Sequence, residues 1–222
     1  MLNDGDIHHL LHVMRAKKGE EIEVVAEDKL YCCKIQNLSP LSIVVDYEIP
    51  VESELPVDVT LFFALAKGDK IDFVVQKATE LGVTRIVLMN TERSVVKFED
   101  KKVNDKLERF RKIAKEASEQ SHRVKIPEIV GVVDIKNIPD NLLADNNLLA
   151  YEKEAGSTLS FDKVIEKKSI SIMIGPEGGF SEKEVDLLVN RGFKLVSLGK
   201  RILRTETAAI YALSVIGFKL EK

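Results

Sequence analysis

Hydrophobic residues near the start of the chain form three short runs that are rich in Val and Ile. Turn residues separate these runs, with Glu27-Asp28 after the first and Ser39-Pro40 after the second. Short apolar runs bounded by turns predict β-strands, here arranged as a small barrel or a meander. The predicted strands cover residues 21–26, 29–38 and 42–49. Before them, residues 8–15 carry apolar positions at near-helical spacing.

Beyond residue 56 the pattern changes to strands that alternate with helices. Apolar runs of strand length lie at residues 59–66, 85–89, 148–151, 169–174 and 194–198. Apolar positions repeat at helical spacing in residues 70–81, 103–120, 181–190 and 206–218. Such alternation predicts an α/β fold with a parallel sheet covered by helices on both faces. Since Pro50 and Pro56 mark the change, we expect one domain at residues 1–56 and another at 57–222.

Two of the predicted helices have distinctive sequences. Ser181 and Glu184 form a capping box, in which each side chain accepts a hydrogen bond from a backbone N–H that the helix start leaves unpaired. The last helix, residues 206–218, is apolar nearly all round. A helix without a polar face is buried on several sides, either in a core or against a second copy of the chain.

Composition excludes several classes of protein. The 222 residues are 45% hydrophobic and 31% charged, as in ordinary globular domains. The longest unbroken apolar run, Leu61–Ala66, is too short to span a bilayer. Acids at Asp4 and Asp6 do not fit a secretory signal peptide. The two cysteines, Cys32 and Cys33, are adjacent and therefore poorly placed for a shared metal or a disulfide. We expect a cytoplasmic protein.

Several common motifs for nucleotide binding, hydrolysis and metal binding can be excluded from the sequence. The phosphate-binding P-loop, the dinucleotide-binding glycine motif and the nucleophile elbow of hydrolases are all absent from the sequence. His8 and His12 share a helix face, but no third ligand type clusters near them. We therefore expect no metal, and favour a surface, RNA-facing or packing role for these histidines.

Three strand ends in the predicted sheet carry unusual loops. One strand ends at residues 149–151, another runs into Gly175-Pro176-Glu177-Gly178-Gly179-Phe180, and a third runs into residues 199–208. Ligands of open α/β folds bind beyond the carboxyl ends of strands, and glycines let a backbone approach a ligand closely. The third loop lies in a stretch, residues 187–205, that carries five bases and no acid. Such a loop suits phosphate groups.

These loops resemble those of a known family. Ile174-Gly175-Pro176-Glu177-Gly178-Gly179, followed by Leu198-Gly199-x-Arg201-Ile202-Leu203-Arg204-Thr205-Glu206-Thr207-Ala208, is similar to the bacterial 16S rRNA uridine-N3 methyltransferase family of the SPOUT class. The resemblance extends over essentially the whole chain. It implies an N-terminal PUA-like β-barrel that binds RNA, a C-terminal SPOUT domain with a deep trefoil knot, and a homodimer.

The resemblance also implies a cofactor and a set of residues that bind it. The cofactor is S-adenosylmethionine, held in the knot between apolar side chains and loop amides, with Glu177 facing its positive groups. The expected cofactor-binding residues are Leu149, Ala150, Tyr151, Ile174, Gly175, Pro176, Glu177, Gly179, Leu198, Gly199, Ile202, Leu203, Thr207 and Ala208.

The implied reaction moves a methyl group to N3 of a uridine near the ribosomal decoding site. The N3 proton must leave, so the site needs a base or a group that stabilises the uracil anion. Arg204 is the candidate for steadying that anion or for orienting the methionine carboxylate. Glu206 is either a proton acceptor, an orienter of Arg204, or an acid favoured at a helix start by the helix dipole.

The partner implied by the resemblance is 16S rRNA in the small ribosomal subunit. The residues expected to contact it are Arg15, Lys17, Lys18, Arg93, Arg123 and Arg201. Two rival hypotheses are a SPOUT methyltransferase with a different RNA target and a non-catalytic RNA-binding assembly factor. The intact loops at 174–179 and 198–208 argue against the second rival.

Overall fold

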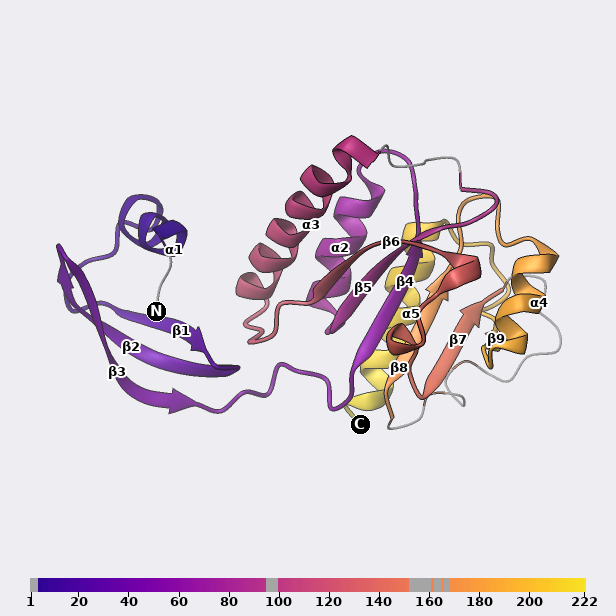
Figure 1. Cartoon of the computed structure of the whole chain (residues 1–222). Coiled ribbons are helices and arrows are strands. Elements are labelled where there is room, and N and C mark those ends of the chain that lie inside the picture. The colour runs from indigo at the N-terminus through magenta and orange to yellow at the C-terminus, as the bar shows by residue number, and fades with distance from the viewer. Residues whose placement is uncertain (1–3, 95–99, 152–160, 162–164, 166–167) are drawn as a thin grey trace. The chain divides into compact units, whose positions relative to one another are not determined.

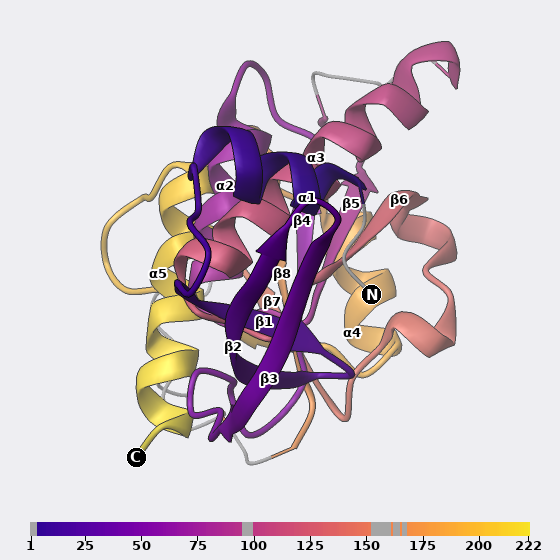
Figure 2. The same ribbon diagram turned by 90° about the vertical axis from the view of Figure 1, so that its left-hand side faces the viewer.

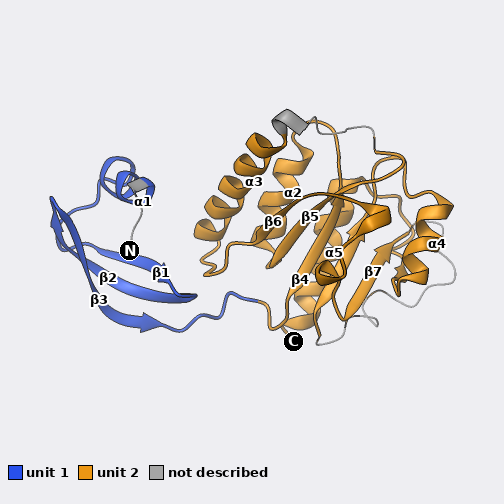
Figure 3. Cartoon of the chain, viewed as in Figure 1, with its two compact units in different colours: residues 1–54 blue, residues 55–222 orange. Residues whose placement is uncertain are grey.

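A computed structural model describes residues 4–94, 100–151, 161, 165 and 168–222. The chain divides into two compact units, residues 1–54 and 55–222 (Figure 3). The sequence predicted the boundary after residue 56, and the structure places it two residues earlier, after residue 54. Leu55 explains the difference, because its side chain packs against the core of the second unit.

The first unit is a small antiparallel sheet with a helical segment. The helical segment consists of α1 (Asp4–His8) and a π-helical turn, η1 (His9–Val13). The strands β1 (Glu21–Ala26), β2 (Lys29–Leu38) and β3 (Leu41–Ile49) pair in the order β1-β2-β3. These are the strands expected from the sequence, in the form of a meander. Leu10, Ala16 and Ile35 form its small core.

The second unit contains a parallel sheet of six strands, as predicted (Figure 1). Its order is β6-β5-β4-β8-β7-β9. The strands are β4 (Val59–Ala64), β5 (Arg85–Asn90), β6 (Glu128–Asp134), β7 (Asn146–Ala150), β8 (Ile170–Ile174) and β9 (Lys194–Val196). Only β6 was not expected. It lies at the edge of the sheet, and Gly131 interrupts an otherwise Ile- and Val-rich run.

Helices cover both faces of this sheet, and Figure 2 shows α5 and α4 on opposite sides of the strands. The helices are α2 (Lys70–Glu80), α3 (Asp100–Gln120), α4 (Glu182–Asn190) and α5 (Thr205–Leu220). Two short 3₁₀ turns, η2 (Ile135–Asn137) and η3 (Asp140–Leu142), lie on the α4 face. Adjacent residues of β4 show the division, since Leu61 and Phe63 pack towards α2 and α5 and Phe62 packs towards α4.

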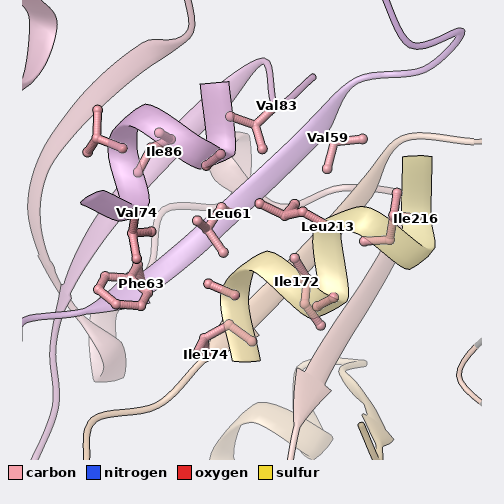
Figure 4. Close-up of a cluster of buried hydrophobic side chains, with 14 of the residues drawn as sticks. Val59, Leu61, Phe63, Val74, Val83, Ile86, Ile172, Ile174, Leu213 and Ile216 are labelled. Carbon is pink, nitrogen blue, oxygen red and sulfur yellow. The ribbon is translucent and has the colours of Figure 1, made fainter. Parts of the chain in front are cut away.

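The larger core fills the space between the sheet, α2, α3 and α5. In Figure 4 the side chains of Leu61, Val74 and Leu213 meet there from β4, α2 and α5. All six residues of β4 are buried, as expected for a central parallel strand. The outer side of α5 is not covered by this core, because Tyr211 and Phe218 remain exposed on it.

None of the helices that the structure describes has the length and apolar character needed to cross a membrane. Nor do the described His, Cys, Asp and Glu side chains gather in threes where a metal ion would fit. His8 and His12 lie close together, with ring centroids 4.8 Å apart.

Candidate active site

A cleft lies at the carboxyl ends of β7, β8 and β9, which are neighbours in the sheet. Its walls are the end of β7, a first loop after β8 (residues 175–181), a second loop after β9 (residues 197–204), and the start of α5. The cleft is open to solvent on one side. The carboxyl edge of a parallel sheet is where open α/β folds bind their ligands.

Glycines shape both loops of the cleft. Gly179 has φ +67° and its N–H donates to the carbonyl of Pro176 at 2.9 Å, which closes a tight turn in the first loop. A Cβ at Gly175 would lie 2.9 Å from the Phe180 ring, so only glycine lets that ring pack there. In the second loop, Gly199 has φ +108°, a conformation that side chains disfavour.

The first loop is held from outside by Arg93, which follows β5. The guanidinium donates from Nη1 to the carbonyl oxygen of Gly178 at 2.9 Å and to that of Phe180 at 3.5 Å. Arg93 also lines the cleft. An arginine that satisfies two carbonyls of one turn fixes that turn, since each bond to a charged donor is stronger than a neutral one.

A buried network joins the same two segments. The carboxylate of Glu184 accepts hydrogen bonds from the N–H of Ser181 at 2.8 Å and from the N–H of Glu92 at 2.7 Å. The Ser181 hydroxyl donates to Glu92 Oε2 at 3.0 Å and accepts the N–H of Glu184, so the expected capping box is confirmed. The capping box therefore does more than begin α4: it ties the segment beside Arg93 to the end of the first loop.

A charge cluster joins the first loop to α5. Lys70 Nζ lies 2.8 Å from Glu177 Oε1 and 3.4 Å from Glu206 Oε2. The hydroxyl of Thr205, a cleft-lining residue, also donates to Glu206 Oε2, at 3.1 Å. We call Lys70, Glu177 and Glu206 the Lys70 cluster.

All three members of the Lys70 cluster are charged at neutral pH. The hydrogen bond to Glu177 raises the pKa of Lys70 above its usual value. Burial alone would raise the pKa of Glu177, but hydrogen bonds from Lys70 and from the residue's own N–H lower it overall. Burial acts on Glu206 in the same direction and is outweighed by its backbone N–H, Thr205 and Lys70, so its pKa is also lowered.

Most of the residues expected to bind the cofactor lie on this cleft. They are Ala150, Tyr151, Ile174, Gly175, Pro176, Gly179, Leu198, Gly199, Ile202, Leu203 and Ala208. Three others do not line it. Leu149 is fully buried in the core on the α4 face, Glu177 pairs with Lys70, and Thr207 is exposed on α5.

The two residues expected to be catalytic lie at the start of α5, beside the cleft. Arg204 is the exposed N-cap residue, and its side chain makes no capping hydrogen bond. Glu206 lies in the first turn and belongs to the Lys70 cluster. Neither side chain lines the cleft, although Leu203 and Thr205 next to them do. Their catalytic roles stay predictions.

Arg123 has a different role from the RNA contact expected of it. Its side chain is buried, and Nη1 donates to the carbonyls of Thr79 and Val83, each at 2.8 Å. These carbonyls lie at and just beyond the end of α2, where a helix concentrates partial negative charge. Arg123 is therefore a structural residue, and its guanidinium does not reach a surface phosphate.

The other residues expected to contact RNA are exposed. Arg15, Lys17 and Lys18 lie in the first unit between η1 and β1, and Arg93 and Arg201 line the cleft in the second unit. Lys18 Nζ is 3.5 Å from Asn37 Oδ1. Arg93 also has the loop-holding bonds described above, which the sequence did not reveal.

Several site residues escaped the sequence reasoning. Phe180, Ser197 and Thr205 line the cleft but were not expected to bind a ligand. Phe180 and Thr205 belong to the loops quoted above and Ser197 directly precedes one of them, and that position is the signal that would have found them. Lys70 offers no such signal, since it lies 107 residues from Glu177 in the sequence.

Comparison with known families matches both units. Residues 53–217 match the model of an RNA methyltransferase domain, and residues 2–46 match that of an RNA methyltransferase PUA domain. The chain is 37% identical over 226 aligned residues to ribosomal RNA small subunit methyltransferase E of Bacillus subtilis (strain 168). That alignment covers 97% of this chain and 88% of the relative.

Two solved structures with bound cofactor are similar to this chain. One is a methyltransferase from Legionella pneumophila in complex with SAM, with a TM-score of 0.85 and 31% identity over 97% of this chain and 89% of that one. The other is ribosomal RNA small subunit methyltransferase E from Neisseria gonorrhoeae bound to S-adenosyl methionine, with a TM-score of 0.82 and 30% identity over 96% and 88%.

Proposed function

Because the chain belongs to the RNA methyltransferase family, we propose that it transfers a methyl group from S-adenosylmethionine to N3 of a decoding-region uridine in 16S rRNA. The observation that carries this proposal is the cleft at the ends of β7, β8 and β9, in a chain that is similar along nearly its whole length to small-subunit rRNA methyltransferases. The chemistry of the cleft and of its charged rim supports it further.

The cleft fits the cofactor by the kind of groups that line it. Ile174, Leu198 and Leu203 supply apolar surface for a flat adenine ring, while the glycine-bearing loops bring backbone N–H and C=O groups within reach of polar edges. When bound, S-adenosylmethionine supplies an electrophilic methyl group on a sulfonium. Tyr151 and Phe180, which line the cleft, would help to exclude water from a bound cofactor.

The protein's part in the reaction is to position the uridine and to stabilise its anion. N3 lies on the Watson–Crick edge, so the base must be unpaired or turned out of its stack. We assign the anion-stabilising role to Arg204, whose exposed guanidinium at the start of α5 is free of capping bonds. With S-adenosylmethionine bound, N3 would take the methyl group as the sulfonium S–C bond breaks, S-adenosylhomocysteine would leave as the neutral thioether, and the N3 proton would pass to solvent.

Glu206 fits an orienting role better than that of proton acceptor. Its carboxylate already accepts the Thr205 hydroxyl and pairs with Lys70, and its pKa is below the usual value. A carboxylate with a lowered pKa is a weak base. Glu206 therefore holds the first turn of α5, which carries Arg204 at its N-cap.

The remaining parts of the proposal concern assembly and RNA contact. Arg93 and Arg201 at the cleft, together with Arg15, Lys17 and Lys18 in the first unit, would bind rRNA phosphates. Exposed Tyr211 and Phe218 on α5 support a homodimer through this helix. We also propose that the two cleft loops form the trefoil knot implied by the family resemblance, and that the protein acts in the cytoplasm, where ribosomes assemble.

The proposed role of Arg204 is tested by Arg204→Ala. We expect kcat for methyl incorporation into 16S rRNA to fall about 100-fold, the size of effect seen when one anion-stabilising donor is lost. Lys219→Ala, at the far end of the same helix, is the control and should retain the parent rate. Methyl incorporation and cofactor affinity that both stay within about twofold of the parent would remove Arg204 from the site.

The rRNA target is tested by mass spectrometry of rRNA nucleosides from a deletion strain. The proposal expects loss of 3-methyluridine from 16S rRNA and its return on complementation. Loss of a different methylated nucleoside would instead identify another RNA target. A purified protein that gives no heat with S-adenosylmethionine in calorimetry would favour a non-catalytic RNA-binding protein.

A further inference from the structure

Lys70 lies at the first position of α2 and contacts two segments of the cleft that are far apart in sequence. Its Nζ is 2.8 Å from Oε1 of Glu177 in the first loop and 3.4 Å from Oε2 of Glu206 in α5. Figure 1 shows α2 and α5 as separate elements of the chain, and both belong to the same hydrophobic core. One ammonium group therefore connects three elements at the edge of the cleft.

The two carboxylates belong to different walls of the cleft. Glu177 sits between Pro176 and Gly179, which line the wall formed by the first loop. Glu206 follows Thr205, which lines the wall formed by α5 and donates its hydroxyl to Glu206. The Lys70 cluster thus joins the two segments that form these walls.

The charges make this arrangement depend on the lysine. Glu177 and Glu206 would repel each other without a cation between them, because two negative charges at short range raise the energy of the arrangement that holds them together. The side chains are partly exposed, at 29% for Lys70, 35% for Glu177 and 17% for Glu206. Ion pairs with this much solvent contact add little to overall stability, so the cluster's contribution is geometric.

We propose that Lys70 is a positioning residue of the methyl-transfer site, which aligns the first loop with the Arg204 end of α5. This inference rests on the proposed function. Lys70 itself does not line the cleft and acts through Glu177 and Glu206. The alignment matters because the methyl group must approach N3 in line, and small displacements of the two walls disturb that approach.

The test compares Lys70→Met and Lys70→Arg with Lys77→Met. Lys77 lies on the same helix and pairs with Glu80 at 2.8 Å, but this pair is not on the cleft, which makes it a matched control. For each variant we would measure cofactor affinity by calorimetry, kcat with small-subunit RNA, and the thermal unfolding midpoint.

For Lys70→Met we expect kcat to fall about tenfold, as for a misplacement smaller than 1 Å, since a full 1 Å can cost about 100-fold. The cofactor Kd should rise about threefold. The thermal midpoint should stay near the parent's. Lys70→Arg should recover most of the activity, since a guanidinium can still bridge two carboxylates. Lys77→Met should match the parent.

The proposal is overturned if Lys70→Met matches Lys77→Met in both kcat and Kd, or if Lys70→Arg is as impaired as Lys70→Met. The cofactor measurement separates this result from failure of the proposed function. A parent protein that binds S-adenosylmethionine but does not methylate small-subunit RNA would refute the target, while a rise in Kd for Lys70→Met alone would still support the positioning role.

Discussion

The two loops of the cleft are held in different ways. The first loop has contacts to three outside elements, through Arg93 after β5, Lys70 on α2, and the buried carboxylate of Glu184. In the second loop, within the described residues, the side-chain hydrogen bonds join only Ser197 and Gly199, and Ile202 is 87% exposed. The first loop is thus a preorganised wall, while the side chains of the second loop remain available for ligands.

This difference indicates a division of labour. When a loop is already ordered, its ordering costs no binding free energy, which suits a cofactor that binds in every catalytic cycle. The second loop carries Arg201 and leads directly to Arg204, and both side chains are exposed. Exposed arginines beside a cleft suit a large anionic substrate. Contacts between its phosphates and these arginines can offset the cost of ordering the second loop.

The largest effect on stability is expected from Glu184→Gln. The buried carboxylate accepts two backbone N–H groups, and an amide can accept only one of them well. We expect the free energy of unfolding in urea to fall by about 2 kcal/mol, since a buried donor is left without its charged partner. Asp186→Asn, exposed on the same helix, is the control. Equal unfolding curves for the two variants would show that the network does not hold the first loop.

A smaller effect, measured as cofactor affinity in the absence of RNA, is expected from Arg93→Met. Without the guanidinium, the carbonyls of Gly178 and Phe180 lose their shared donor and the first loop is no longer fixed. We expect the Kd for S-adenosylmethionine to rise about tenfold, equivalent to about 1.4 kcal/mol. Arg85→Met serves as control, because Arg85 pairs with Glu128 at the opposite end of the same strand. A Kd equal to that control would break the comparison of the two loops.

The smallest effect is expected from Ile202→Ser in the second loop. An 87% exposed side chain contributes little to folding, so unfolding should change by less than about 0.5 kcal/mol. Ile202 lines the proposed cofactor site, so we expect the Kd for the cofactor to rise about threefold to fivefold when its apolar side chain is lost. Ile126 is also exposed but does not line the cleft, so Ile126→Ser tests whether the loss of any exposed isoleucine weakens cofactor binding. A marked loss of stability in Ile202→Ser would mean that the second loop is held as firmly as the first.

The sequence predicted the elements whose patterns are unambiguous. The six buried residues of β4 and the capping box of α4 could be recognised directly, because burial on both faces and capping each leave a local signature. β6 was missed although Ile and Val flank Gly131 on both sides, because a glycine in the middle of a short run favours a bulge or turn over a strand. The cleft was located correctly at the strand ends, since parallel topology alone places those ends together.

What the sequence could not predict are contacts between distant segments. The partnership of Lys70 with Glu177 depends on how α2 and the first loop pack, and no local spacing encodes it. The error over Arg123 has the same origin. Its basic character suggested a surface contact, but the fold places it beneath the end of α2, where its guanidinium satisfies backbone carbonyls. Charge can be read from a sequence, whereas the burial of a single long side chain depends on its tertiary neighbours.

The most direct test of the central claim is a crystal structure of the protein grown with S-adenosylmethionine. We predict the adenosyl group in the cleft between the two loops, in contact with Leu198 and the backbone near Gly175, with the Arg93 and Lys70 contacts unchanged. Cofactor bound elsewhere on the molecule, or an empty cleft in crystals saturated with cofactor, would contradict the claim.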